Sequence, residues 1–364
     1  MKKIVKHTLP DCCRIIAISD IHTCQHLLDN ILKKADYRAG EDYLIIVGDI
    51  LEHGKQNLQT ISYIRRLCQN KRVFCLMGNN DTASYHMAFR YDYSKFMMKR
   101  SKKPNNTFLQ MASMLDINEF PENKFEMLRS KVAEHFKAEL DFIQGLPYVL
   151  ETQDYIFVHA GIENRPDWTN TSDTYALTQP FYMRESHCTG KWVVVGHFPC
   201  YNYRRSNNTN LPIIDKNKKI IGIDGGLTIK SASQINAFCI NKSGSSYSYN
   251  TIWDTQFEKR IINSNYESGM SPIYVDPYLH DFSLINIQNG IALVKNTSTG
   301  EQGFIPEQKL SYDNGKLKIW YSLNAFLSVR KGEVVSLCNI DDKFAFIISE
   351  NGQVGWIPSK LISN

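Results

Sequence analysis

Six residues of types that bind divalent metal ions are spread over the first two hundred positions of the chain. They are two aspartates, one asparagine and three histidines: Asp20, His22, Asp49, Asn79, His159 and His197. Their carboxylate, amide and imidazole groups suit Mn²⁺, iron and Zn²⁺. Six ligands, one of them a carboxylate that can bridge, are enough for two ions. A two-metal site lowers the pKa of a bridging water and clamps phosphoryl oxygens during in-line displacement, so these residue types favour metal-dependent phosphoryl chemistry.

The apolar runs that precede these residues have the length and composition of buried strands. The runs cover residues 14–18, 44–47, 73–76, 155–158 and 193–195. Gly48 permits a sharp turn after the second run, which leaves Asp49 at the carboxyl end of that strand. Ligands bind at the carboxyl ends of strands in open α/β sheets, so we expect the five runs to bring their polar residues to one edge.

Helical patterns separate the first three runs and dominate the segment after the third. Residues 27–32 and 58–67 present apolar side chains at helical spacing, which favours a sheet covered by helices. The segment from about 82 to 145 is predicted as a helical insertion, because apolar residues recur at helical spacing between 125 and 143. Strand patterns return at 155 and continue through 220–223 and 235–240. The chain is therefore predicted to be α/β (α+β) up to about residue 245.

The overall composition is that of a globular protein. The 364 residues carry a net charge of +5 and contain no block of lysine and arginine long enough to predict specific nucleic-acid binding. The first residues lack the apolar core of a signal peptide, and no apolar run approaches the ~20 residues of a membrane-spanning helix. Nine scattered cysteines include no C-x-x-C pair, which favours a reduced protein. We therefore expect a cytoplasmic protein without a membrane partner.

The C-terminal part differs in composition and contains a weak internal repeat. A polar, turn-rich stretch at 241–250 predicts a domain boundary near 245, followed by a linker over 246–283. Within 284–364, residues 300–306 and 352–358 share the pattern G-x-x-G-aromatic-I-P. This pattern resembles the Src-homology-3-like small barrels that bacteria append to enzymes, and implies one or two all-β modules and a peptide or protein ligand; two similar hairpins in a generic β tail are the alternative. Trp356 fits either a peptide-binding groove or the core of so small a barrel.

Five motifs in order resemble those of the calcineurin-like metallophosphoesterases. The motifs are D-x-H, G-D-x-x-x-x-G, G-N-x-D, H-A-G and G-H-x-P, and the resemblance spans roughly residues 14 to 240. The branch that they resemble most includes serine/threonine phosphoprotein phosphatases and symmetrical dinucleoside-tetraphosphate hydrolases. The resemblance implies a catalytic domain over residues 1–245, a β-sandwich flanked by helices, and two divalent ions, with Mn²⁺ as the first choice and iron or zinc as alternatives.

The resemblance also assigns a role to each candidate ligand. Asp20 and His22 are expected to hold one ion, and Asp49 to bridge the two. The second ion falls to the remaining three: Asn79, His159 and His197. Arg184 stands in a segment like the family's W-I-R-E and is expected to clamp the substrate phosphate, for which a planar guanidinium is suited.

Two positions depart from the family pattern. His53 stands where the family has a phosphate-binding arginine, and Asn80 stands where it has a general acid. Asp81 either orients residue 80 or acts as a helix N-cap. An amide cannot deliver a proton to a leaving alkoxide, and loss of a positioned acid costs roughly 10²–10⁴-fold in rate. We therefore expect that His53 or His86 supplies the proton, that the leaving group needs none, or that the enzyme is slow.

The predicted function is the hydrolysis of phosphate esters by a hydroxide that two metal ions activate, with Asn80, Asp81, Arg184 and His53 as catalytic or substrate-binding residues. A serine/threonine phosphoprotein is the first choice of substrate, because the tail module offers a protein-docking site. The alternatives are a dinucleoside-polyphosphate hydrolase or phosphodiesterase, whose anhydride leaving group tolerates Asn80 better, and a non-catalytic scaffold that recognises a phosphoprotein.

Overall fold

The computed structural model describes residues 4–89, 106–117, 125–205, 208–275, 281–319 and 323–362, and these form two compact units. The first unit comprises Met1–Phe198, Pro212–Thr228 and Ile235–Asp254. The second comprises Pro199–Leu211, Ile229–Gln234 and Thr255–Asn364. The chain therefore passes between the units several times, and each unit is described by itself.

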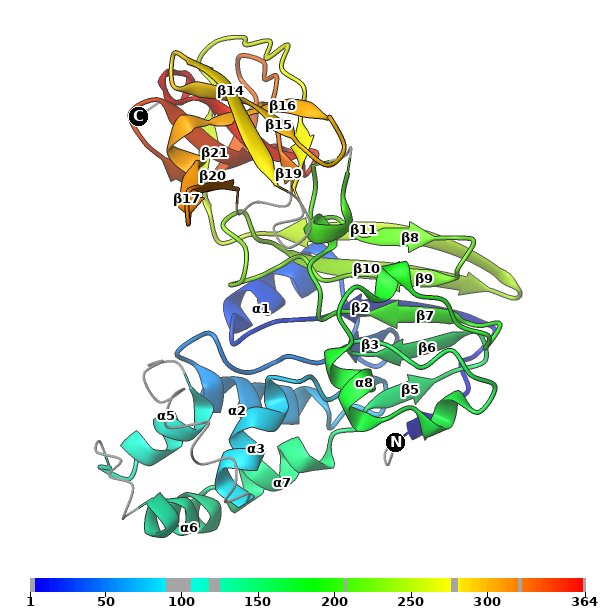
Figure 1. Ribbon diagram of the computed structural model, residues 1–364. Helices are drawn as coiled ribbons and strands as arrows, with labels where there is room; N and C mark the ends of the chain where they lie inside the picture. Colours follow the sequence, from blue (N-terminus) through cyan, green and yellow to red (C-terminus); the bar gives the residue numbers. More distant parts are fainter. Residues whose placement is uncertain are drawn as a thin grey trace. The chain divides into compact units, whose positions relative to one another are not determined.

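The first unit is a sandwich of two β-sheets (Figure 1). One sheet has the order β11 (Ser246–Asp254), β10 (Ile235–Ser243), β2 (Cys12–Ile18), β3 (Tyr43–Ile46), β4 (Val73–Cys75). The other has the order β1 (Ile4–Lys6), β5 (Val149–Glu151), β6 (Tyr155–Val158), β7 (Trp192–Val195), β9 (Ile220–Gly222), β8 (Ile213–Asp215). The strands β2, β3 and β4 are parallel, and so are β6, β7 and β9. Each sheet thus has three neighbouring strands whose carboxyl ends lie at a common edge.

Alternation along the central strands builds two cores. Ile15 and Ala17 of β2 pack with Phe157 of the opposite sheet, in the core between the sheets. Ile16 and Ile18 face the other way and pack in the core beneath the helices. Because successive side chains of a strand point to opposite faces, a strand that is buried on both faces must be apolar throughout. This explains why the runs that precede the candidate ligands are almost entirely apolar.

Helices cover the outer face of the β2-containing sheet. They are α1 (Gln25–Lys34), α2 (Asn57–Leu67), α3 (Asp81–Phe89), α5 (Thr107–Ser113), α6 (Phe125–His135) and α7 (Lys137–Gly145). A shorter helix, α8 (Asp173–Thr178), follows β6. The described parts of the predicted insertion, 82–89, 106–117 and 125–145, contain helices as their regular elements. Among the helices of the described residues, none is long and apolar enough to cross a membrane.

The second unit is all-β, and its described residues include two separate hydrophobic clusters, one around Val335 and Ile347 and one around Ala292 and Ile305. Its strands are β12 (Glu258–Ile261), β13 (Ile273–Tyr274), β14 (Phe282–Gln288), β15 (Ile291–Asn296), β16 (Gln302–Pro306), β17 (Ser311–Asp313), β18 (Lys316–Lys318), β19 (Leu323–Asn324), β20 (Val334–Ile340), β21 (Phe344–Ile348) and β22 (Val354–Pro358). Each copy of the sequence repeat forms a strand followed by a short 3₁₀ helix: β16 with Glu307–Lys309, and β22 with Ser359–Leu361. The predicted fold class, a helix-flanked sandwich with C-terminal all-β structure, is confirmed.

Trp356 lies in the core of the second unit. Its side chain is only 2% exposed and stacks on Phe346 at 4.4 Å between ring centroids, while the ammonium group of Lys309 lies 5.0 Å from its ring. Of the two places expected for Trp356, a peptide-binding groove and the core of the barrel, the structure shows the core. The peptide ligand of the module stays a prediction.

The segment 246–283, expected as a linker, contains paired strands. β11 pairs with β10 of the first unit, and β12 pairs with β20 of the second. In β11 alternate residues are exposed and polar, so the strand has too little apolar content to stand out in the sequence. Segments 199–211 and 229–234 join the second unit, where the backbone N–H of Val354 donates to the carbonyl of Asn208 at 2.6 Å. The boundaries at 245 and 284 stay predictions.

One partly buried ion pair joins β2 to the start of β3, and its loss should destabilise the first unit. The guanidinium of Arg14 donates to both carboxylate oxygens of Asp42, at 3.0 and 2.5 Å. Because hydrogen bonds between charged groups contribute about 1.5–3 kcal/mol, Asp42→Asn should lower the free energy of unfolding in urea by an amount of that order. The control Asp36→Asn removes a carboxylate from the same loop whose partner, Arg38, is exposed, and should be nearly neutral.

This stabilisation should also depend on pH. Burial opposes ionisation of Asp42, but the hydrogen bonds and charge of Arg14 outweigh it, so the pKa of Asp42 lies below its ordinary value of 3.8. A carboxyl group with a depressed folded-state pKa stabilises the protein above its unfolded pKa and loses that effect as the pH falls through the folded one. The difference in unfolding free energy between wild type and Asp42→Asn should therefore be constant near neutrality and shrink at acid pH. A difference that grows on acidification would contradict the assignment.

Candidate metal centre

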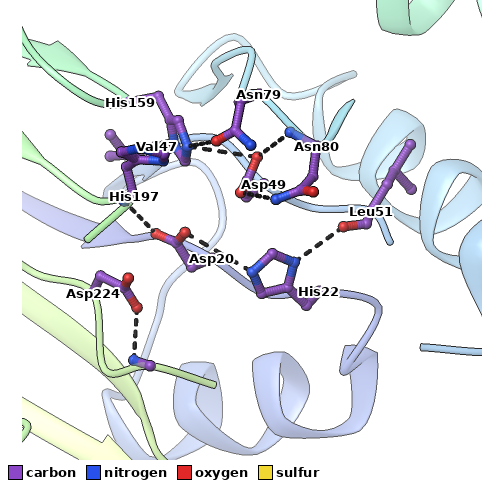
Figure 2. Close-up of polar contacts among 12 residues, drawn as sticks. Asp20, His22, Val47, Asp49, Leu51, Asn79, Asn80, His159, His197 and Asp224 are labelled. Carbon is purple, nitrogen blue, oxygen red and sulfur yellow. Dashed lines mark hydrogen bonds and ion pairs between the residues drawn. The ribbon is translucent and has the colours of Figure 1, made fainter. Parts of the chain in front are cut away.

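The six candidate ligands meet at the carboxyl ends of the parallel strands (Figure 2). Asp20 and His22 follow β2, Asp49 follows β3, and Asn79 follows β4. From the opposite sheet, His159 follows β6 and His197 follows β7. The ligand atoms of Asp20, Asp49 and His159 all lie within 4.8 Å of one another, and the three side chains are buried. The sandwich therefore brings ligands from both sheets to one edge, as the strand pattern predicts.

Asp49 lies between two groups of ligands. On one side, Asp20 Oδ1 is 4.0 Å from His22 Nε2. On the other side, His159 Nε2 lies 3.5 Å from Asp49 Oδ1. Figure 2 shows the Asp49 carboxylate between these groups, with Asn79 beside His159. This central position is the one that a bridging carboxylate requires.

Backbone carbonyls fix the tautomers of two histidines. His159 Nδ1 lies 2.9 Å from the carbonyl oxygen of Val47, and His22 Nδ1 lies 3.1 Å from that of Leu51. A carbonyl only accepts hydrogen bonds, so both Nδ1 atoms carry the proton and both Nε2 atoms keep a lone pair. A second hydrogen bond of this kind is the usual arrangement of metal-binding histidines.

The Asn79 amide is crowded by imidazole nitrogens. One of its terminal atoms lies 3.0 Å from His159 Nε2 and 2.9 Å from His197 Nδ1. If that atom is the amide oxygen, three lone-pair donors converge on one point, and a divalent cation satisfies all three. If it is the amide nitrogen, it can donate to both rings instead. A rotation of the Asn79 amide by half a turn exchanges the two arrangements, and the one with the oxygen toward the rings fits a metal ion without any rearrangement of the backbone.

Burial keeps His22 and His197 neutral. Burial and the charge of His159 lower the pKa of His197 to about 4, and burial also lowers the pKa of His22. At neutral pH both rings are therefore uncharged, which is the form that binds a metal ion.

The two carboxylates affect each other. Burial and the charges of Asp224 and Asp49 raise the pKa of Asp20 well above its ordinary value. Burial acts in the same direction on Asp49, but His159 and His22, with further hydrogen bonds, outweigh it and lower the pKa of Asp49. Two carboxylates that compete for ionisation in one buried site are stabilised together when a divalent cation lies between them.

The ligand-bearing loops have strained backbones. Asp20, His22, Asp49 and His197 have φ angles of 54°, 46°, 52° and 65°, in the left-handed region. For residues other than glycine this conformation costs roughly 1–2 kcal/mol each, although Asp, Asn and His tolerate it better than most. Such outliers cluster at functional sites, where surrounding structure holds them in place.

Two glycines allow the close approach of these loops. A Cβ atom at Gly78 would overlap the side chain and backbone nitrogen of Asp49, and one at Gly196 would overlap the carboxylate of Asp20. Both glycines directly precede a ligand, Asn79 and His197 respectively. Their lack of a side chain is therefore what lets the ligand loops pack against each other.

Asn80 and Asp81 hold the loops of the site together. Asn80 donates to both oxygens of Asp49, from its backbone N–H at 2.8 Å and from its amide Nδ2 at 2.6 Å. Asp81 is fully buried and accepts from the backbone N–H groups of Asp49, Leu51 and Gly78 at 2.9–3.0 Å. Burial and the charge of Asp49 raise the pKa of Asp81 to about 8. Both side chains act on the position of Asp49, and the catalytic roles expected for them stay predictions.

His53 and Arg184 lie at different depths. The His53 ring is 4.8 Å from that of His22, edge to face, which puts it next to a ligand. Arg184 is exposed and stacks over Phe181 at 4.3 Å, and Phe181 in turn packs against Phe198, the neighbour of His197 in sequence. The structure thus brings His53 to the ligand cluster and connects Arg184 to it through two aromatic rings. Their contacts with substrate stay predictions, as does a proton-donating role for His86 in α3.

Sequence reasoning missed several groups that shape the site. The carbonyls of Val47 and Leu51 fix two tautomers, but any residue type supplies a carbonyl, so the sequence carries no signal for them. Gly78 and Gly196 stand in the motifs G-N-x-D and G-H-x-P, and their place directly before a ligand is the signal that could have identified them. Asp224 was not missed: it lies two positions after β9 in a D-G-G segment that resembles the family's closing motif, and it is not expected to be a ligand. It accepts from the N–H of Gly226 at 2.6 Å and lies beside Asp20.

Two family models match the chain. A model described as calcineurin-like phosphoesterase matches residues 13–221, more than half of the chain, and one described as variant SH3 domain matches residues 311–364. The chain therefore belongs to the calcineurin-like phosphoesterase family and carries a variant SH3 domain at its C-terminal end. Members of this family are hydrolases that use divalent metal ions, which agrees with the cluster of ligands at the sheet edges.

Curated proteins with a similar sequence include several symmetrical bis(5′-nucleosyl)-tetraphosphatases. The symmetrical bis(5′-nucleosyl)-tetraphosphatase of Buchnera aphidicola subsp. Schizaphis graminum is 37% identical over 166 residues, which are 45% of this chain and 50% of the relative. The protein of that name from Janthinobacterium sp. is 26% identical over 163 residues, 45% of this chain and 48% of the relative. The chain thus matches only about half the length of these relatives.

Solved structures with a similar arrangement include two protein phosphatases. A cold-active protein-tyrosine phosphatase from Shewanella aligns with a TM-score of 0.42 at 14% identity, over 69% of this chain and 82% of that one. A serine/threonine protein phosphatase from Saccharomyces cerevisiae aligns with a TM-score of 0.41 at 12% identity, over 70% and 85%.

The packing of Gly78 against Asp49 leads to a prediction about metal binding. Gly78→Ala should push Asp49 away from the other ligands and lower the affinity for Mn²⁺ about tenfold or more, the usual effect of disturbing the support of a ligand. The matched control is Gly145→Ala at the end of α7, where a Cβ meets no atom within 4 Å. Calorimetric titration with Mn²⁺, with circular dichroism as a check of folding, makes the comparison. A folded Gly78→Ala protein with wild-type affinity would show that this contact does not position the ligand.

Proposed function

We propose that this protein hydrolyses the phosphoanhydride of dinucleoside polyphosphates, with a symmetrical dinucleoside tetraphosphate as substrate and two nucleoside diphosphates as products. The curated relatives that match the first unit are named for this activity. They favour the alternative of the sequence-based prediction over its first choice, a phosphoprotein.

One observation carries the proposal: the side chain of Asn80 is hydrogen-bonded to Asp49 and carries no acidic proton that it could transfer to a leaving group. Its amide nitrogen donates to Asp49 Oδ2 at 2.6 Å, and an amide is not an acid in water. A serine alkoxide must be protonated as it leaves, whereas a nucleoside diphosphate leaves as a phosphate whose second pKa is roughly 6. The anhydride therefore loses little from an asparagine at this position, and an alkyl phosphate loses roughly 10²–10⁴-fold.

The chain's own residues have separate tasks in this mechanism. Asp20 and His22 would hold one divalent ion, and Asp49 would serve both. Asn79, His159 and His197 would hold the second. When bound, the pair of ions supplies an activated water and neutralises phosphoryl oxygens. Asn80 keeps the Asp49 carboxylate oriented, and Asp81 fixes the backbone on either side of it. Arg184 is proposed to bind a phosphate of the substrate, because its planar guanidinium can donate two parallel hydrogen bonds.

Initial rates with added Mn²⁺ test the proposal. Diadenosine tetraphosphate should be cleaved at least about 100-fold faster, in kcat/KM, than a phosphoserine peptide, and ADP should be the product on chromatography. The Asp49→Asn protein should be inactive on both substrates, which excludes a contaminant. Faster turnover of the phosphopeptide would instead support the phosphoprotein phosphatase prediction. If the metal-loaded wild-type protein were no more active than Asp49→Asn, the prediction of a non-catalytic scaffold would be supported.

A substitution at residue 80 tests the physical argument directly. Asn80→His introduces a group that can act as an acid, so hydrolysis of the phosphoserine peptide should rise by roughly 10²–10⁴-fold while diadenosine tetraphosphate changes much less. Asn80→Ala is the control, because it removes the hydrogen bond to Asp49 without adding an acid. If Asn80→His left the ratio of the two rates unchanged, the leaving-group argument would fail.

A further inference from the structure

A second feature of the first unit begins close to the metal ligands. It is a groove of about 960 Å³ between α2 and its neighbours α1, α5 and α7. None of the six metal ligands lines it. Its volume is in the range of sites that hold a drug-sized organic molecule, so a nucleotide fits. Figure 1 shows α2 and α5 side by side, and they contact each other.

One face of α2 supplies most of the polar lining. Lys55, Gln59, Ser62, Arg66 and Gln69 follow one another at intervals of three or four residues, all are exposed, and all line the groove. Gln59, Ser62 and Arg66 lie within α2, where this spacing puts them in one row over roughly 10 Å at a rise of about 1.5 Å per residue, and Lys55 and Gln69 flank the two ends of the helix. Each of the five side chains can donate a hydrogen bond. These side chains therefore form a continuous series of hydrogen-bond donors and include no acidic residue.

The charge of the groove is positive. Lys55, Arg65 and Arg66 line it, and Glu139 is the one acidic side chain among its described lining residues. Glu139 pairs with Arg65 at 3.5 Å between charged atoms, which leaves the charges of Lys55 and Arg66 uncompensated by a carboxylate within the lining. An extended anion with several acceptor oxygens is the ligand that such a surface favours.

The groove begins close to the metal centre. Lys55 comes two residues after His53, whose ring touches that of His22. Gln110, a lining residue on α5, donates to the carbonyl of Gly54 at 3.2 Å and ties this loop to the groove wall. A phosphate chain that starts at the metal ligands can therefore continue past His53 to Lys55 and onto α2.

We propose that this groove binds the distal nucleotide of the dinucleoside polyphosphate, the half that lies beyond the bond to be cleaved. Its phosphates lie along Lys55 and Arg66, and its base packs against the apolar lining side chains Leu58, Met114 and Phe136, of which Met114 is 67% exposed. This inference rests on the proposed function and adds a specificity site to it: small phosphate esters reach the metals without using the groove, and dinucleotides use both.

A charge reversal on α2 tests the groove by binding rather than by turnover. The probe is a diadenosine tetraphosphate analogue with methylene groups in place of the bridging oxygens, titrated calorimetrically into the Mn²⁺-loaded protein. Arg66→Glu should raise its dissociation constant about tenfold or more, since a hydrogen-bonded charge is lost and a like charge appears. The matched control is Lys33→Glu, because Lys33 also lies exposed in the last turn of a helix, at the end of α1 opposite to Gln25 of the groove. It should bind as wild type does.

Activity on p-nitrophenyl phosphate separates the groove from the metal centre. Arg66→Glu should keep wild-type kcat and KM on this small ester, because the ester does not extend to α2. Three results would each contradict nucleotide binding in the groove. The Arg66→Glu protein could bind the analogue as tightly as wild type does, the Lys33→Glu protein could be weakened as much as Arg66→Glu, or wild type could fail to bind the analogue. Wild-type protein that binds the analogue through Arg66 but does not cleave diadenosine tetraphosphate would leave the groove standing and reject the proposed function.

Discussion

The burial of the Asp49 carboxylate is the constraint on which the rest of the site depends. A buried carboxylate is stable only where hydrogen bonds and opposite charges replace its water. Asn80 supplies two hydrogen bonds, the histidines lie within a few ångströms, and Asp81 anchors the backbone nitrogen of Asp49 itself. Asp20 competes with Asp49 for ionisation, as its raised pKa indicates. The arrangement is therefore complete when positive charge lies between the two carboxylates.

The sandwich can hold so many ligands close together because rigid strands carry them. Each ligand sits within a few residues of a strand that is buried on both faces, so its backbone has little freedom to move away. The left-handed φ angles at Asp20, His22, Asp49 and His197 are held by this packing and by the glycines that let the loops approach. The rigid strands thus maintain the strained backbone conformation of the ligand residues.

The second unit is assembled from distant parts of the chain. Residues 199–211 follow directly on the loop of His197, and the segment around Asn208 and Thr209 pairs with Gln353 and Val354 at the start of β22. A strand of the variant SH3 domain thus obtains hydrogen bonds from a segment more than 140 residues earlier in the sequence. Trp356 is buried in this unit because a barrel of this size has a small core and needs its largest side chain there.

The sequence by itself determined the types of the ligands and the strands that carry them. Apolar runs that end in Asp, Asn or His are local patterns, and five of them in order specify both the family and the edge where the ligands gather. Tertiary structure decided what depends on register and distance. It engaged Asn80 with Asp49, aligned the donors of α2 into a groove beside α5, and paired the polar strand β11 with β10. These outcomes are set by packing between segments far apart in the chain, and residue type alone does not encode which partner a hydrogen-bonding group will meet.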